Sequence, residues 1–135
     1  RNLRIILFLF QIFLGSYQID FSFYDQFKKQ NNNFIGLFTA ININSRFGYA
    51  KPIKSKSKIE MLDIIKKFVD EVKNIKIIES DAGNEFINND IKKFLKNKNI
   101  ELLIFNKKVN KNALSMIERF NRTIRDKLTN YMISF

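Results

Sequence analysis

Three acidic residues are placed where their carboxylates could share one site. Asp20 lies in the middle of a segment of alternating apolar and polar residues, Asp81 ends a short apolar segment, and Glu118 lies near the start of an amphipathic segment. Carboxylates that converge repel one another unless a cation lies between them. Mg²⁺ prefers oxygen ligands, and two such ions about 4 Å apart promote in-line displacement at phosphorus. These residue types therefore favour metal-dependent phosphoryl transfer.

Asp20 belongs to a segment that has the pattern of a β-strand. In residues 17–24, YQIDFSFY, apolar side chains occupy one face, and Gln18, Asp20 and Ser22 occupy the other. Because Asp is disfavoured in strands, Asp20 either faces solvent or has a function. Asp25, beyond the end of this alternation, is the rival candidate for that function.

The rest of the chain continues as strands and helices. Residues 28–33 predict a turn between strands, and a change to three- and four-residue apolar spacing predicts a helix capped by Ser55 or Ser57. Predicted strands cover residues 17–24, 34–42, 47–53, 75–81 and 100–105, and predicted helices cover about 57–72, 89–97 with a cap at Asn88, and 113–133. The order βββαβαβα predicts an α/β fold with a five-stranded mixed sheet flanked by helices. We expect Asp20 and Asp81 on adjacent strands.

The last predicted helix carries an apolar stripe and a charged rim. At about 100° per residue, one stripe that would pack on the sheet contains Ala113, Leu114, Ile117, Phe120, Ile124, Leu128 and Tyr131. Glu118 lies at the edge of this stripe, with Arg122 and Arg125 beside it. Glu118 could be only an i,i+4 ion-pair partner of Arg122, just as Asp81 could be only a turn residue before Ala-Gly-Asn.

Composition limits the chemistry further. The chain has 135 residues, enough for one domain with a core, and its net charge of +11 favours a polyanionic partner such as nucleic acid. It contains no Cys and no His, which excludes disulfides, Cys/His zinc sites, cysteine nucleophiles and histidine-based triads. Any catalysis would have to use carboxylates, hydroxyls, amines or bound metal.

Residues 1–16 form an N-terminal apolar segment whose role the sequence leaves open. Its apolar run, residues 5–14, is too short to span a bilayer. It is similar to the charged and apolar regions of a secretory signal, but no A-x-A-like cleavage site follows. A segment that packs, or lacks order, ahead of the first strand is the favoured interpretation, and we expect no membrane partner. The chain begins with Arg1 and ends inside its last predicted helix, so we expect a fragment of a longer protein.

Three stretches resemble the catalytic core of retroviral-type integrases, most closely those of self-synthesising DNA transposons and related retroelements. They are YQIDFSFY, ESDAGNEF and IERFNRTIRDKL, and the similarity extends over about residues 17–131. The D-x-G-x-E-F and E-R-F-N-R-T patterns are specific when they occur together. The resemblance implies a ribonuclease H-like fold and identifies residues 17–135 as a catalytic core that is cut short at its C-terminus.

The resemblance also implies roles for single residues. Asp20, Asp81 and Glu118 match the metal-binding DDE triad, which implies two Mg²⁺ or Mn²⁺ ions, and Glu85 matches a residue that supports the site. Side chains expected to contact DNA are Lys107, Lys108, Lys111, Asn121, Arg122 and Arg125. The last three match DNA-facing positions of the family, whereas the lysines are expected to contact phosphate because they flank the rim of the site.

The implied activity is DNA integration by metal-dependent polynucleotidyl transfer, comprising 3′-end processing and strand transfer. The implied partners are the element ends and target DNA, and we expect a homo-oligomer in the nucleus of a host cell. The alternative from another class is a non-catalytic DNA-binding remnant of an integrase. A nuclease of the same fold that cuts RNA–DNA hybrids would need a further carboxylate, which the sequence pattern does not supply.

Overall fold

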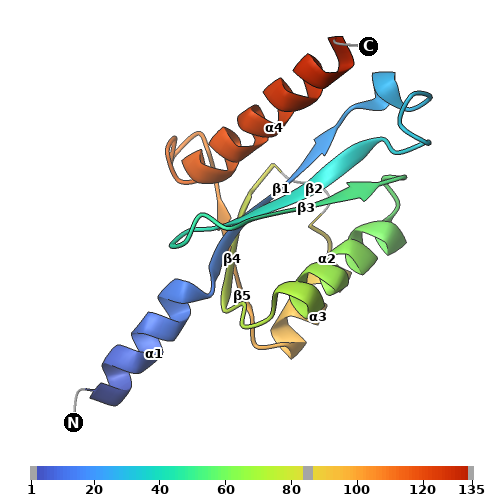
Figure 1. Cartoon of the computed structure of the whole chain (residues 1–135). Helices are drawn as coiled ribbons and strands as arrows, with labels where there is room; N and C mark the ends of the chain where they lie inside the picture. The colour runs from blue at the N-terminus through green and yellow to red at the C-terminus, as the bar shows by residue number, and fades with distance from the viewer. Residues whose placement is uncertain (1–2, 84–86, 134–135) are drawn as a thin grey trace.

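The strands of the chain form one mixed sheet in the order β3-β2-β1-β4-β5 (Figure 1). A computed structural model describes residues 3–83 and 87–133. The elements are α1 Leu3–Leu14, β1 Ser16–Phe23, η1 Asp25–Phe27, β2 Gly36–Asn42, β3 Gly48–Ile53, α2 Lys58–Val72, β4 Ile77–Asp81, α3 Asn89–Asn97, β5 Glu101–Phe105 and α4 Ser115–Ile133. Strands β1, β2 and β3 pair antiparallel, whereas β4 runs parallel to both β1 and β5. The predicted five-stranded mixed sheet is therefore confirmed.

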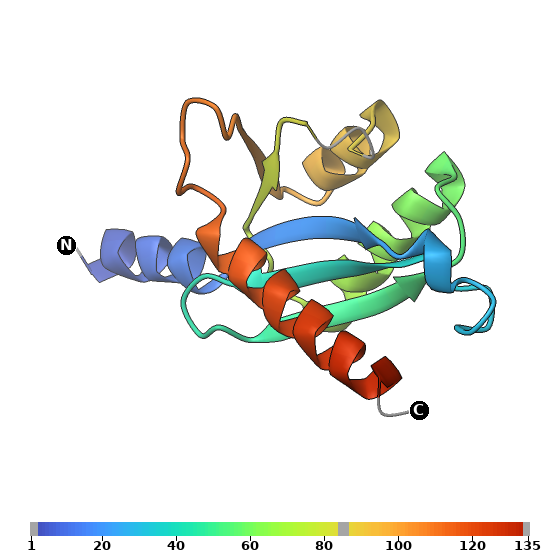
Figure 2. The same ribbon diagram turned by 90° about the horizontal axis from the view of Figure 1, so that it is seen from above.

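Helices cover both faces of the sheet. Helices α2 and α3 lie on one face and α4 lies on the other (Figures 1 and 2). The main core forms under α2 and α3, where Ile19, Phe38 and Phe68 are almost completely buried. Because side chains alternate along a strand, the polar face of β1 that carries Asp20 turns towards α4.

Local signals set the helix starts where the sequence predicts them. The hydroxyl of Ser57 accepts a hydrogen bond from the backbone N–H of Glu60 and caps α2, and Asn88 caps α3 in the same way through the N–H of Ile91. Such caps satisfy backbone donors that have no partner inside the helix. The predicted cap at Asn88 is confirmed, and of the two serines proposed for α2, Ser57 is the cap.

The N-terminal apolar segment forms a helix, α1, which extends away from the rest of the molecule (Figure 1). Its exposed apolar side chains include Ile5, Phe8 and Phe13. The junction is held by polar contacts: Ser16 Oγ donates to the carbonyl of Ile12, and Asn42 Nδ2 donates to the carbonyl of Leu14. In the described ranges, no helix is long and apolar enough to cross a membrane.

Only the first half of α4 packs as its apolar stripe predicts. Leu114, which directly precedes α4, and Ile117 are buried against Ile41 of β2, whereas Leu128 and Tyr131 are 36% and 63% exposed. A helix that crosses a twisted sheet stays in contact with it over part of its length only. The prediction that the whole stripe is buried is therefore wrong for the C-terminal half, where a cavity of about 370 Å³ separates α4 from the β1–β2 connection.

Candidate active site

Asp20 is held in a fixed orientation on the α4 face of β1. Its Oδ1 accepts the backbone N–H of Phe21 at 2.9 Å, and its Oδ2 accepts the side-chain amide of Asn121 at 2.8 Å. The carbonyl oxygen of that amide in turn accepts the hydroxyl of Thr39 at 2.7 Å. Thr39 lies opposite Asp20 in the β1–β2 register. A hydrogen-bond chain therefore runs from β2 through α4 to the carboxylate.

These hydrogen bonds place the side chain of Asn121 inside the protein. The resemblance implies that Asn121 faces DNA, and contact with DNA stays a prediction. In the structure the residue is buried, with 5% exposed, and both ends of its amide have protein partners. A buried amide that is hydrogen-bonded at both ends restricts the groups it contacts. In the structure Asn121 is therefore a positioning residue for Asp20.

Asp81 lies on β4, the parallel strand adjacent to the strand of Asp20. The last registered pair of β1 and β4 is Gln18 with Glu79. Two residues further along each strand are Asp20 and Asp81, and a two-residue step returns both side chains to the same face. Because β1 and β4 are neighbours in the sheet, the predicted placement of Asp20 and Asp81 on adjacent strands is confirmed. Oδ1 of Asp81 also accepts the backbone N–H of Gly83 at 3.2 Å.

Gln18 positions the start of α4, and with it Glu118. Its side-chain amide donates to the carbonyl of Ala113 at 2.8 Å and accepts the backbone N–H of Ile117 at 3.0 Å. The second bond satisfies a donor in the first turn of the helix, which has no partner inside the helix. Gln18 is 3% exposed and lies two residues before Asp20. One strand thus carries Asp20 and also fixes the helix that carries Glu118.

Lys107 joins the other two acidic residues. Its Nζ lies 2.9 Å from Oε1 of Glu118 and 3.6 Å from Oδ2 of Asp81. The hydrogen bond to Glu118 is the main cause of a raised pKa for the Lys107 ammonium. Among the described residues, Arg122 forms no ion pair with Glu118, so the i,i+4 pair that the sequence allows is not formed.

The charges of the site act on one another. Burial is the main cause of a raised pKa for Asp20, and the negative charges of Asp81 and Glu118 raise it further. The hydrogen bond from the N–H of Phe21 and the positive charge of Lys107 act in the opposite direction. The three carboxylates are therefore close enough to repel one another, and Lys107 offsets part of that repulsion.

The other side chains expected to contact DNA lie on the surface. Lys108, Lys111, Arg122 and Arg125 are exposed. Within the part of the chain that the structure describes, these four side chains form no ion pair. Their charges are accessible, and their contacts with DNA stay a prediction. Glu85, expected to support the site, lies outside the described residues.

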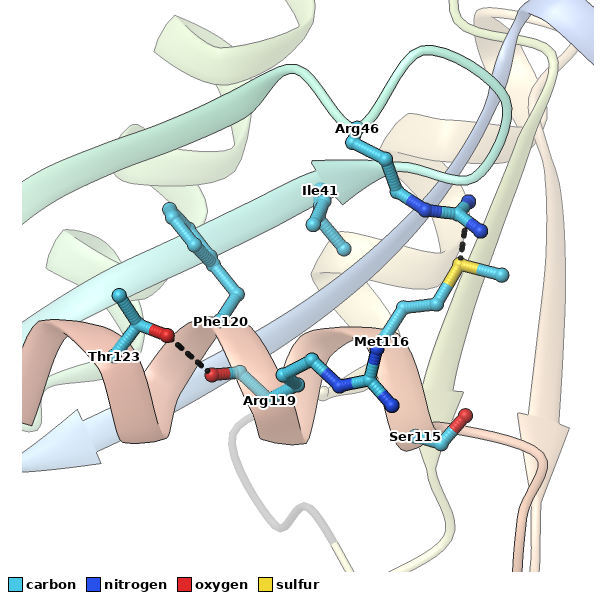
Figure 3. Close-up of a pocket in the computed structure, with 7 residues that line it drawn as sticks. All are labelled: Ile41, Arg46, Ser115, Met116, Arg119, Phe120 and Thr123. Atoms are coloured by element: carbon cyan, nitrogen blue, oxygen red, sulfur yellow. Dashed lines mark hydrogen bonds between the residues drawn. The ribbon is translucent and has the colours of Figure 1, made fainter.

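A pocket lined by two arginines lies between α4 and the β2–β3 turn. This pocket of about 450 Å³ is lined by Ile41, Arg46, Ser115, Met116, Arg119, Phe120 and Thr123 (Figure 3). A guanidinium N–H of Arg46 contacts Sδ of Met116 at 3.0 Å. None of the three acidic residues lines this pocket, so it is separate from the candidate site.

Comparisons with known proteins bear on the fold and on sequence similarity. No family model matches the chain. The chain is 34% identical over 108 residues to an uncharacterised transposon-derived protein of Caenorhabditis elegans, a match that covers 79% of this chain and 37% of that protein. The chain thus spans little more than a third of the length of this relative.

Two solved integrase structures are similar in fold. The catalytic core domain of BIV integrase matches with a TM-score of 0.69 and 18% identity, covering 90% of this chain and 74% of that domain. The HTLV-2 integrase catalytic core, solved with magnesium in a trimeric form, matches with a TM-score of 0.67 and 17% identity, covering 90% of this chain and 73% of that one. The expected resemblance is confirmed: the chain has the ribonuclease H-like fold of retroviral integrase catalytic cores, and its sequence is similar to that of a transposon-derived protein.

Proposed function

We propose that this chain is the catalytic core of a DDE-type integrase, which joins transposon or retroelement DNA to target DNA. One observation carries the proposal. Asp20 and Asp81 lie on the adjacent strands β1 and β4, and the ammonium of Lys107 connects Asp81 to Glu118. Two carboxylates, one from a strand and one from a helix, therefore share one positive charge that also acts on Asp20. Such a concentration of negative charge favours a divalent cation.

The donor set suits Mg²⁺ or Mn²⁺, because both ions take carboxylate oxygens as ligands. In residues 3–83 and 87–133 no three acidic side chains lie close enough together to hold an ion as they stand. The ammonium of Lys107 supplies a cation at the carboxylates of Asp81 and Glu118, which supports the fit of a positive charge there. When bound, two divalent ions would activate the attacking oxygen and stabilise the leaving oxygen at phosphorus.

The chain's own side chains have distinct roles in the proposed reaction. Water, and then a DNA 3′-hydroxyl, would attack a phosphodiester; a new P–O bond forms, and the bond from phosphorus to the 3′-oxygen breaks, so that this oxygen leaves as a 3′-hydroxyl. Asp20, Asp81 and Glu118 would hold the divalent ions. Asn121 keeps Oδ2 of Asp20 turned towards α4. The exposed side chains of Lys108, Lys111, Arg122 and Arg125 bind DNA phosphates and fix the duplex relative to the carboxylates.

The proposed partners follow from the same function. They are the element ends, target DNA and further copies of this chain, acting in the nucleus of a host cell. The net charge of +11 supports binding to a polyanion. The trimeric form of the HTLV-2 core supports an oligomer.

A second candidate function is a non-catalytic DNA-binding remnant with the same fold. It is favoured by one observation: Lys107 already neutralises part of the charge of Asp81 and Glu118 without a divalent ion. Such a protein would bind DNA through its basic surface and would show no metal-dependent chemistry.

The two candidates are separated by transfer on a labelled branched duplex, in which attack by a 3′-hydroxyl at the junction releases a labelled strand. The integrase proposal expects release in Mg²⁺ or Mn²⁺, none in EDTA, and none with Asp81→Asn. Asp126→Asn, on the exposed surface of α4, is the matched control and should retain release. DNA binding by the wild-type chain without any metal-dependent release would favour the remnant.

A further inference from the structure

Lys107 reaches the carboxylates because of where β5 ends. Phe105, the last residue of β5, is registered with Asp81, and its carbonyl accepts the N–H of Ala82. The chain then turns at Asn106, whose side-chain oxygen accepts the N–H of Lys108 at 2.9 Å. Such a turn fixes the backbone on both sides of Lys107. The position of its side chain is therefore set by the sheet register and a local turn.

The contact differs from an ordinary surface ion pair. An exposed Lys–carboxylate pair contributes little, because solvent screens it. Lys107 instead bridges two carboxylates on different elements, and its positive charge also acts on Asp20. Within the described part of the chain, no other Lys or Arg forms an ion pair with these three residues. Lys107 is thus their one described counter-charge.

An ammonium and a divalent ion cannot both sit between Asp81 and Glu118. Both are cations, and each would use the same carboxylate oxygens. The side chain of Lys107 is 43% exposed, so it can leave towards solvent without disturbing the core. A bound metal ion would therefore replace the ion pairs of Lys107.

We propose that Lys107 is a built-in counter-ion that holds Asp81 and Glu118 together in the metal-free protein and is displaced when a divalent ion binds. This inference rests on the proposed metal-dependent function and adds a regulation of the same site. It also gives Lys107 two successive partners. Carboxylates hold it before metal binding, and after displacement its ammonium would bind DNA phosphate together with Lys108 and Lys111 of the same loop.

The first test measures metal binding without DNA. Isothermal titration with Mn²⁺ compares the wild-type chain with Lys107→Gln and Lys107→Arg. Removing the competing charge should lower the Kd for Mn²⁺ roughly two- to fivefold, because a partly exposed ion pair is worth up to about that factor. Lys107→Arg keeps the charge and should bind Mn²⁺ as the wild-type chain does.

Lys108→Gln is the matched control for this titration. It lies on the same loop, removes the same charge, and carries an exposed side chain. Its Kd for Mn²⁺ should stay close to the wild-type value. Equal Mn²⁺ affinity in Lys107→Gln and Lys108→Gln, or weaker affinity in Lys107→Gln, would overturn the counter-ion proposal and leave the proposed function intact. No Mn²⁺ binding by any of these proteins would overturn both.

A second test uses the wild-type chain alone, so it does not depend on how a variant folds. An amine-acetylating reagent is applied in EDTA and in Mn²⁺, and the acetylation of each lysine is measured by mass spectrometry. Lys107 should be protected in EDTA and become several-fold more reactive in Mn²⁺, whereas Lys108 should react equally in both. Equal reactivity of Lys107 in the two conditions would contradict the proposal.

Discussion

Asn121 on α4 donates a hydrogen bond of 2.8 Å to Oδ2 of Asp20 on β1. The same amide accepts the hydroxyl of Thr39, which is 1% exposed. One buried side chain therefore connects the helix that carries Glu118 with the strand that carries Asp20. This connection makes the geometry of the site depend on the docking of α4.

The first prediction concerns Asn121→Ala. This change leaves the buried hydroxyl of Thr39 with only a longer contact of 3.4 Å to the carbonyl of Asp20, and it removes the side-chain donor to Oδ2 of Asp20. We therefore expect a loss of about 1–3 kcal/mol in the free energy of unfolding, together with reduced transfer activity. Denaturant titration and the branched-duplex assay measure the two effects. Asn130→Ala, at an exposed position of the same helix, should change neither. Weaker DNA binding by Asn121→Ala with unchanged stability would instead restore the DNA-facing role.

The second prediction concerns the pH dependence of stability in EDTA. Because the folded state raises the pKa of Asp20 above 3.8, the folded protein binds this proton more tightly than the unfolded chain does. The contribution of Asp20 to the free energy of unfolding is therefore fully present below pH 3.8, and it is lost as the pH rises through the raised pKa of the folded state. The difference in unfolding free energy between the wild-type chain and Asp20→Asn isolates this effect. Wild-type stability should fall with rising pH relative to Asp20→Asn, and parallel curves would contradict the assignment.

The third prediction concerns the salt dependence of DNA binding. Arg122→Ala leaves the carboxylates in place and removes one exposed positive charge. It should weaken DNA binding and reduce the slope of log K against log salt by about one unit. Fluorescence anisotropy over a salt series measures the slope. Lys92→Ala, on the exposed surface of α3, should leave the slope near its wild-type value. An unchanged slope for Arg122→Ala would remove Arg122 from the DNA contacts.

Local patterns were sufficient to predict most of the fold. Alternation predicted β1, and apolar segments next to turns predicted the other strands. Three- and four-residue spacing predicted α2, α3 and α4, and the caps at Ser57 and Asn88 fixed two helix starts. These signals act between residues a few positions apart. Helix α1 was missed because its segment is apolar on nearly every side and shows no polar face to indicate a helix.

The polar contacts of the site could not be predicted in this way. Asn121 and Asp20 are 101 positions apart, and Gln18 contacts residues 95 and 99 positions away. The partners of these side chains are decided by how α4 docks on the sheet, which no local pattern specifies. Lys107 was predicted to contact phosphate because it lies near the rim, but its pairing with Asp81 and Glu118 depends on the register of β4 with β5.

Strand transfer by Glu118→Gln in Mg²⁺ tests the central claim most directly. Glutamine keeps the size and helix propensity of the side chain but removes the negative charge that a metal ion needs. Transfer should fall by about three orders of magnitude or more, while DNA affinity and the melting temperature stay close to wild type. Glu101→Gln, at an exposed position at the start of β5, should transfer as the wild-type chain does. Wild-type transfer by Glu118→Gln would contradict the assignment of Glu118 to a DDE site.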